Sequence, residues 1–189
     1  MQPHIARPGA PACIIDAAAR GDESSWQQLV DRYSNLLWAV VRAHRLTGSD
    51  AADVVQTSWL RLIEHLPEIR NRDCIGAWLA TTARRECLRL LRRTARCEPM
   101  EEIGVVDEEP SDVDAALLRG ERDAALWRAF KRLPQRDQAL LRLLTSEPAP
   151  SYDEVAAALG MPVGSIGPTR GRALARLRRE LLATQGAAA

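Results

Sequence analysis

The sequence predicts an all-α fold of two small helical domains joined by an acidic, flexible linker. Apolar residues recur at helical spacing over most of the chain, and Gly and Pro fall mostly between these periodic stretches. The charge also changes along the chain: residues 22–97 carry 12 basic and 9 acidic side chains, residues 98–123 carry 2 and 10, and residues 124–189 carry 10 and 5. Two basic helical segments on either side of an acidic strip indicate separate domains and a polyanionic partner such as nucleic acid.

The first domain is expected at residues 14–97, after a flexible leader of residues 1–13 that contains three Pro. Gly, Pro and polar clusters interrupt the apolar pattern inside this domain and mark the ends of its helices. The expected helices span residues 14–20, 23–45, 50–66 and 74–96.

A linker and a second domain are expected in the remainder of the chain. Residues 98–115 contain two Pro, one Gly and a dense cluster of acids, without a sustained apolar stripe. A segment of this composition buries too little apolar surface to fold by itself, so we interpret it as an interdomain linker. The helical pattern then resumes, which predicts a second domain at residues 116–183 and a short tail at residues 184–189.

The last helical stretch of the chain is predicted to form a helix-turn-helix. Ser151 and Glu154 have the spacing of a capping box, in which each side chain bonds the backbone N–H of the other residue. Gly160 lies in the short turn before the second helix. Ser165 is expected to cap that second helix, which places Pro168 in the first turn, where its missing N–H has no intrahelical partner anyway.

The second helix of this pair has a polar stripe opposite its apolar face. The stripe follows the spacing i, i+4, i+7 and i+11 and consists of Ser165, Thr169, Arg172 and Arg176. These four residues are candidates for contacts in the major groove of duplex DNA. A helical hairpin with a solvated Arg face is the alternative interpretation.

A second candidate site lies on the helix expected at residues 74–96. Between residues 84 and 96 this helix carries six Arg and a single acid, Glu86. Such a cluster is self-repelling unless a polyanion neutralises it, so we predict a helix that tracks phosphates. Trp78 could stack on an unpaired base beside this Arg cluster. For a lone Trp, however, a place in the hydrophobic core is the favoured interpretation. Cys87 is also assigned to the core. The candidate DNA contacts are Trp78, Arg84, Arg85, Arg89, Arg92 and Arg93.

The sequence predicts no catalytic residue, no metal site and no cofactor. Its four Cys and three His form neither a C-x-x-C pair nor a zinc-ligand spacing. A Gly-rich phosphate loop, a nucleophile elbow and a His beside a plausible nucleophile are also missing. The chain shows neither a signal-peptide pattern nor an apolar run of membrane-spanning length. We therefore expect a protein that is not an enzyme, is not inserted in a membrane, and acts in the cytoplasm with reduced thiols.

The order of these segments resembles a bacterial RNA polymerase sigma factor of the extracytoplasmic-function group, which keeps only regions 2 and 4. AARGDESSWQQLVDRYSNLLW resembles the opening helices of the family, SDAADVVQTSWLRLIEHL its polymerase-binding helix, and WLATTARRECLRLLRR its minus-10 reading helix. LWRAFKRLPQRDQALLRLL, together with the helix-turn-helix, resembles region 4, which reads the minus-35 duplex. The resemblance covers residues 16–182.

This resemblance implies a transcription initiation factor that binds core RNA polymerase, through its β′ clamp helices and its β subunit, and directs it to promoter DNA. Asp53, Gln56 and Leu60 stand where the family docks on the clamp helices, whereas periodicity alone shows only a mixed polar face. An anti-sigma factor is a further partner that the resemblance allows. The rival interpretation is a free-standing helix-turn-helix regulator, whose other half would normally be a ligand-sensing or dimerisation domain.

The sequence departs from the family at several reading positions. Arg85 and Arg89 stand where the minus-10 helix commonly has Asn and Asp. Thr169 stands where the recognition helix commonly carries Arg, and Leu174 replaces a further Arg. The promoter sequence is therefore not predicted. In the family, the segment that corresponds to the acidic linker runs through the polymerase cleft.

Overall fold

The computed structural model describes residues 12–97 and 121–186, and every regular element in these two ranges is a helix. The leader up to residue 11, the acidic linker expected at 98–115 and the tail from residue 187 lie outside the described residues. The all-α fold class predicted from the sequence is confirmed.

The first described range forms four α-helices. They are α1 (Ala12–Ala19), α2 (Glu23–Ala43), α3 (Gly48–His65) and α4 (Ile75–Cys97), and two 3-10 turns, Leu66–Glu68 and Arg72–Cys74, connect α3 to α4. The observed ends lie within about two residues of the expected ones, because caps and breaks are local signals. For example, the Asp22 carboxylate accepts from the Ser25 N–H at 2.8 Å and caps α2. Its hydrogen bonds with Ser25 and Ser24 lower the pKa of Asp22.

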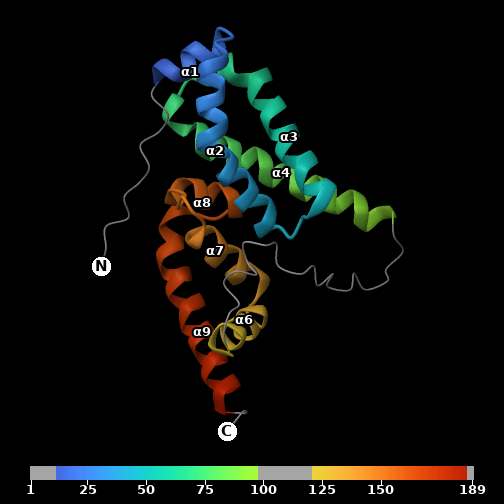
Figure 1. The fold of residues 1–189 in the computed structure, drawn as a ribbon, viewed down its shortest axis with the longest axis vertical. Helices are drawn as coiled ribbons and strands as arrows, with labels where there is room; N and C mark the ends of the chain where they lie inside the picture. The colour runs from blue at the N-terminus through green and yellow to red at the C-terminus, as the bar shows by residue number, and fades with distance from the viewer. Residues whose placement is uncertain (1–11, 98–120, 187–189) are drawn as a thin grey trace.

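The second described range forms a further helical unit below the first in Figure 1. It consists of α6 (Glu121–Lys131), α7 (Gln135–Thr145), α8 (Tyr152–Leu159) and α9 (Ile166–Gly186), with a 3-10 turn at Val163–Ser165. Helix α8 and the long α9 are the two helices of the predicted helix-turn-helix. Gly160 ends α8 in the left-handed conformation, at φ 61°, which Gly adopts without steric cost.

One hydrophobic core runs through both helical units. Buried residues of α2 and α4 belong to the same cluster as buried residues of α7 and α8. The sequence predicts two domains but does not predict that they share a core, since the residues concerned lie far apart along the chain. Members of this cluster include Leu37 and Val40 of α2, Ala80 and Ala83 of α4, Leu140 and Leu143 of α7, and Val155 and Ala158 of α8.

A second, smaller cluster lies within the lower unit. Leu133, Leu141 and Ala173 are buried together, with Phe130 and Leu177 packed against them. This cluster joins α6, α7 and α9, so the lower unit has apolar packing of its own besides the part that it shares.

Candidate nucleic-acid and polymerase interfaces

The predicted polymerase-binding face of α3 is exposed. Asp53 and Gln56 are exposed, and Leu60 is 52% exposed, whereas Leu62 on the opposite face is fully buried. Ile63 extends the same face and is 54% exposed. Sequence reasoning missed Ile63, although its spacing of i+3 from Leu60 and i+7 from Gln56 was a signal that could have found it. The face thus combines two polar and two large apolar side chains, and neighbouring exposed apolar side chains with a polar surround make it a candidate surface for a protein partner.

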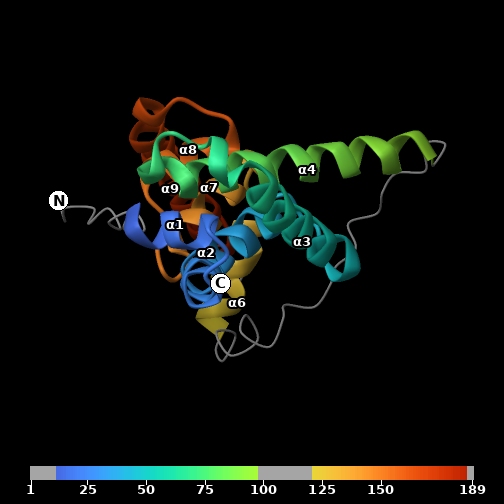
Figure 2. The ribbon, with the colours of Figure 1, turned by 90° about the horizontal axis from the view of Figure 1, so that it is seen from above.

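Four of the five predicted DNA-contacting Arg of α4 lie exposed, and three of them are on its distal half. Figure 2 shows this part of α4 extending beyond the other helices. Glu86 pairs with Arg89 at 3.2 Å, and the Arg89 side chain remains 60% exposed. Because that ion pair lies on the surface, it leaves most of the positive charge of the stripe available to a polyanion. The four exposed residues are Arg85, Arg89, Arg92 and Arg93.

Arg84 is placed differently from the rest of the stripe. Its guanidinium is half-buried and lies against Gly160, so closely that a Cβ on Gly160 would collide with it. The structure therefore separates Arg84 from the four exposed Arg and brings it to the turn of the helix-turn-helix. The sequence predicted Arg84 as a DNA contact because it belongs to the Arg cluster at residues 84–96, and that pattern does not include contacts with a distant part of the chain.

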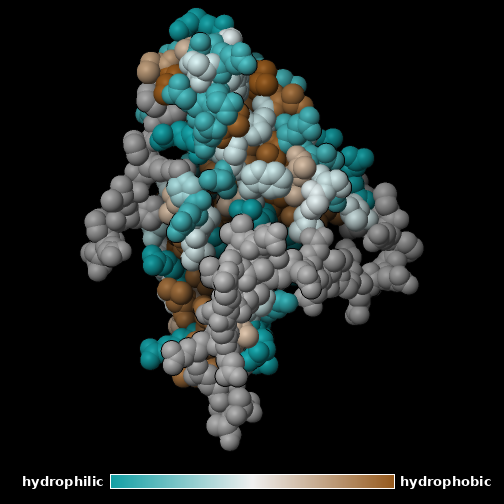
Figure 3. Space-filling view, in the orientation of Figure 1, coloured by the Kyte–Doolittle hydropathy of each residue, from teal (hydrophilic) through white to brown (hydrophobic). Residues whose placement is uncertain are grey.

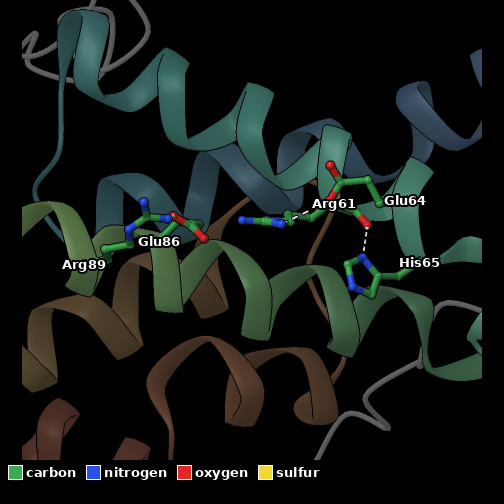
Figure 4. Close-up of polar contacts among 5 residues, drawn as sticks. All are labelled: Arg61, Glu64, His65, Glu86 and Arg89. Atoms are coloured by element: carbon green, nitrogen blue, oxygen red, sulfur yellow. Dashed lines mark hydrogen bonds and ion pairs between the residues drawn. The ribbon is translucent and has the colours of Figure 1, made fainter.

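Trp78 is half-buried and packs against the main hydrophobic core. Its ring centroid lies 6.0 Å from that of His65, at an interplanar angle of 41°. The His65 ring nitrogen Nδ1 is 3.0 Å from the Arg61 carbonyl oxygen, and Arg61 pairs with Glu64 at 3.1 Å on the same helix (Figure 4). These contacts agree with a core role for Trp78, and they leave only part of its ring accessible for stacking on a base.

The first helix of the helix-turn-helix begins with the predicted capping box. Ser151 Oγ accepts from the Glu154 N–H at 3.2 Å, and Glu154 Oε2 accepts from the Ser151 N–H at 2.7 Å. The expected start of the second helix is confirmed, since α9 begins at Ile166, directly after Ser165, and Pro168 lies in its first turn. The expected role of the Ser165 side chain as a cap is wrong. Helical backbone already begins at Val163 in a 3-10 turn, and the Ser165 hydroxyl donates to the Pro162 carbonyl at 2.7 Å.

The polar stripe of α9 is divided between an exposed part and an anchored part. Arg172 is exposed, and its Nη2 donates to Thr169 Oγ1 at 3.1 Å. Arg176 instead forms an ion pair with Asp137 of α7, whose side chain is only 6% exposed. Since the carboxylate is buried and the pair bridges two helices, Arg176 holds α9 on α7 as well as presenting charge. Arg172 is therefore the stripe residue best placed to meet DNA.

Hydrophobic residues also reach the surface along α9, and Figure 3 shows apolar surface in the lower unit. Leu174, which stands at a position where an Arg is common in the resembled family, is 44% exposed, and Leu182 is 59% exposed. A Leu can touch a thymine methyl group but donates no hydrogen bond to a base edge. With Leu at position 174, this part of α9 therefore offers fewer hydrogen-bond donors to base edges than it would with Arg at that position.

The described residues contain no group of three or more His, Cys, Asp or Glu that could hold a metal ion. Cys87 is fully buried, and burial raises the pKa of its thiol to about 12. Among the described helices, none combines the length and the apolar character that a membrane span needs.

Comparisons with known proteins agree with this architecture. Residues 29–97, which include α3 and α4, match the sigma-70 region 2 family. The chain is 24% identical over 163 residues to the ECF RNA polymerase sigma-E factor of Salmonella typhimurium, covering 81% of this chain and 84% of that protein. It is 27% identical over 170 residues to the ECF RNA polymerase sigma factor SigM of Mycobacterium tuberculosis, covering 89% and 83%.

Two solved structures share the fold. CnrH, solved in complex with the cytosolic domain of CnrY, is 23% identical with a TM-score of 0.60, covering 90% of this chain and 96% of that chain. The sigma factor RpoE of Bartonella quintana, solved in complex with the anti-sigma factor NepR, is 20% identical with a TM-score of 0.55, covering 82% and 96%.

Proposed function

Because this chain belongs to the extracytoplasmic-function sigma factors, we propose that it binds core RNA polymerase and directs transcription initiation at specific promoters. The observation that carries the proposal is the family match at residues 29–97, which includes both the exposed face of α3 and the Arg stripe of α4. The same segment thus holds a surface suited to a protein partner and one suited to a polyanion.

Each of the two helical units has a separate role in this proposal. Residues 14–97 act as region 2, which docks on polymerase through Asp53, Gln56, Leu60 and Ile63 and opens the minus-10 element with α4. Residues 116–183 act as region 4, in which α9 reads the minus-35 duplex, with Arg172 nearest the base edges. The exposure of these side chains supports the assignment.

The proposed partners are core polymerase, through its β′ clamp helices and its β subunit, and promoter DNA. Both solved structures of the same fold are complexes, and one of them holds an anti-sigma factor. We extend an anti-sigma partner to this chain as part of the proposal. The protein acts by binding and not by catalysis, in the cytoplasm, where polymerase meets the chromosome.

Transcription in vitro with core polymerase over a genomic fragment library tests the proposal and identifies the promoter together.

A pair of matched double variants tests the polymerase-binding face of α3. The test variant combines Asp53→Ala and Gln56→Ala. The control combines Gln27→Ala and Asp31→Ala on α2, an exposed pair of the same composition whose side chains bond each other at 2.8 Å. The α3 double variant should lose most polymerase association at unchanged helical content, because both side chains are exposed.

The α2 control should retain polymerase association. Equal binding by the two double variants would contradict the α3 assignment. Tight, promoter-specific DNA binding by the wild-type chain without polymerase, and no transcription when polymerase is added, would overturn the sigma-factor proposal in favour of a free-standing regulator.

A further inference from the structure

Three glycines of the helix-turn-helix are not required by anything in the described part of the chain. The structure gives the surroundings of seven glycines, of which three have positive φ and a fourth has another side chain against its Cβ direction. The other three, Gly164, Gly167 and Gly171, have neither feature, and a Cβ added to any of them would lie in open space. All three belong to the turn Val163–Ser165 or to α9.

Glycine is unfavourable at such positions unless something requires it. It weakens a helix relative to Ala, because it loses more backbone freedom on folding. Gly171 is the sixth residue of α9 and lies in the helix interior, where this effect is largest. Close approach of the backbone to a ligand is a common use of glycine. Since no described part of the chain uses the space beside these glycines, that space is left for a bound partner.

The three glycines form one face, which points away from the core and is called the glycine face below. Their spacing of i, i+3 and i+7 places them on one side of the turn and of α9. Ile166 and Ala173, on the opposite side, are fully buried. All three glycines are exposed, and Figure 1 shows α9 along the edge of the lower unit. The outward face of α9 therefore begins with exposed backbone.

The charge around the glycine face favours DNA over a protein helix as its partner. Residues 164–179 contain five Arg and no acid, and all five Arg are exposed. A concentration of positive charge favours a polyanion. One of these residues, Arg172, directly follows Gly171 and belongs to the polar stripe that is the candidate DNA site. The glycine face thus lies within a site that is assigned on independent grounds.

Exposed backbone matters in the major groove, because a helix nearly fills it. An α-helix with its side chains is about 10–12 Å across. The major groove of B-DNA is about 12 Å wide and about 8.5 Å deep. Side chains on the leading face of a helix therefore limit how far it enters the groove. A leading face of glycines lets the backbone, and the side chains beside that face, come closer to the base edges.

We propose that the glycine face leads α9 into the major groove of the minus-35 duplex and that Gly171 is a specificity-determining residue, an inference that rests on the proposed function. With only a hydrogen at position 171, α9 enters the groove far enough for Arg172 to reach a base edge. Leu174 lies at i+3 from Gly171 and is 44% exposed, so it continues the same face towards the thymine methyl groups. The glycines therefore weaken the helix but bring it closer to DNA.

Gly171→Ala tests this inference, because stability and recognition should change in opposite directions. Ala is the better helix former and its methyl group meets open space in the free chain, so the urea midpoint followed by circular dichroism should rise. The polymerase complex should nevertheless bind its promoter at least about fivefold more weakly, which is the lower end of what one base contact contributes. Loss of fold does not produce this combination.

A longer side chain at the same position should have a larger effect. Gly171→Leu should weaken promoter binding more than Gly171→Ala does, since Leu is also a good helix former but extends further into the groove. Ala183→Leu adds the same kind of side chain at an exposed position near the end of α9 and is the control for size. Asn35→Ala, at an exposed position of α2, improves helix propensity and is the control for stability. Neither control should change promoter affinity.

The minus-35 sequence distinguishes close approach from a general defect. On a promoter with a scrambled minus-35 element, Gly171→Ala should have little effect, because the base contacts are already lost. An equal loss of affinity on both promoters would overturn the specificity role of Gly171. Unchanged affinity in both Gly171 variants would overturn entry of the glycine face into the groove and would favour a protein helix as its partner.

The inference and the proposed function fail in different ways. A wild-type chain that does not support transcription with core polymerase would count against the proposed function. Entry of α9 into the major groove is then still tested by binding of the full chain alone to duplexes selected from a random library. Gly171→Ala should weaken that binding at least about fivefold as well, and an unchanged affinity would overturn the inference.

Discussion

Arg172 and Arg176 lie one turn apart on α9 but have different surroundings. Arg176 is bound to the buried carboxylate of Asp137, so moving it to DNA would leave a buried charge unpaired. Arg172 is exposed, and it donates a hydrogen bond to Thr169, a neighbour on the same helix. Thr169 stands where the family commonly has Arg, so more of the readout is expected to fall on Arg172.

Arg172→Ala is therefore expected to weaken minus-35 recognition. If Arg172 pairs with a guanine, the loss should be about 1–3 kcal/mol on the preferred sequence and near zero on a sequence already changed at that base pair. If it holds a phosphate, all sequences should weaken alike. Transcription across a panel of minus-35 variants measures both cases, and an unaltered rate on every variant would exclude a reading role for α9.

Helices and their caps were largely predictable at the scale of single elements. The Ser151 and Glu154 capping box follows from spacing alone, because it depends on residues within one turn. Spacing alone does not predict the ion pair of Arg176 with Asp137 or the position of Arg84 at Gly160, because each contact joins segments that lie far apart in the sequence. Spacing shows which side chains share a face, but tertiary packing decides which of them are exposed.

The distal half of α4 predicts a salt-dependent contribution to promoter binding. The double substitution Arg89→Ala and Arg92→Ala should make the fall of log affinity with log salt less steep, by about 1.4–1.8 in the slope. Binding releases about one counterion fewer for each phosphate that is no longer neutralised by an Arg. Filter binding of the polymerase complex to promoter DNA at several salt concentrations measures the slope. Arg20→Ala with Arg42→Ala, two exposed Arg outside α4, is the control and should leave the slope as it is. A slope unchanged by the α4 substitutions would mean that the stripe is only solvated.

At the scale of the whole molecule, one hydrophobic core of the described residues crosses the boundary between the two helical units, and a smaller one lies within the lower unit. Leu143 of α7 belongs to the shared cluster, together with residues of α2 and α4. Leu141, two residues earlier on the same helix, belongs to the cluster within the lower unit. These two residues have the same side chain on the same helix. Comparing their Ala variants therefore distinguishes the stability of the lower unit from the coupling between the two units.

Replacing either Leu with Ala should destabilise the protein by about 2–5 kcal/mol, because the substitution removes buried apolar atoms and leaves a cavity behind. Their effects on the upper unit should differ, because Leu143 packs in the core that includes α2 and α4. In a Trp127→Phe background, the remaining Trp residues all lie in the upper unit and report its unfolding in urea. Leu143→Ala should lower the urea midpoint of this fluorescence transition, and Leu141→Ala should lower it less. Midpoints that neither substitution changes would mean that the upper unit unfolds independently of α7, and that the shared core contributes nothing to the stability of the whole molecule.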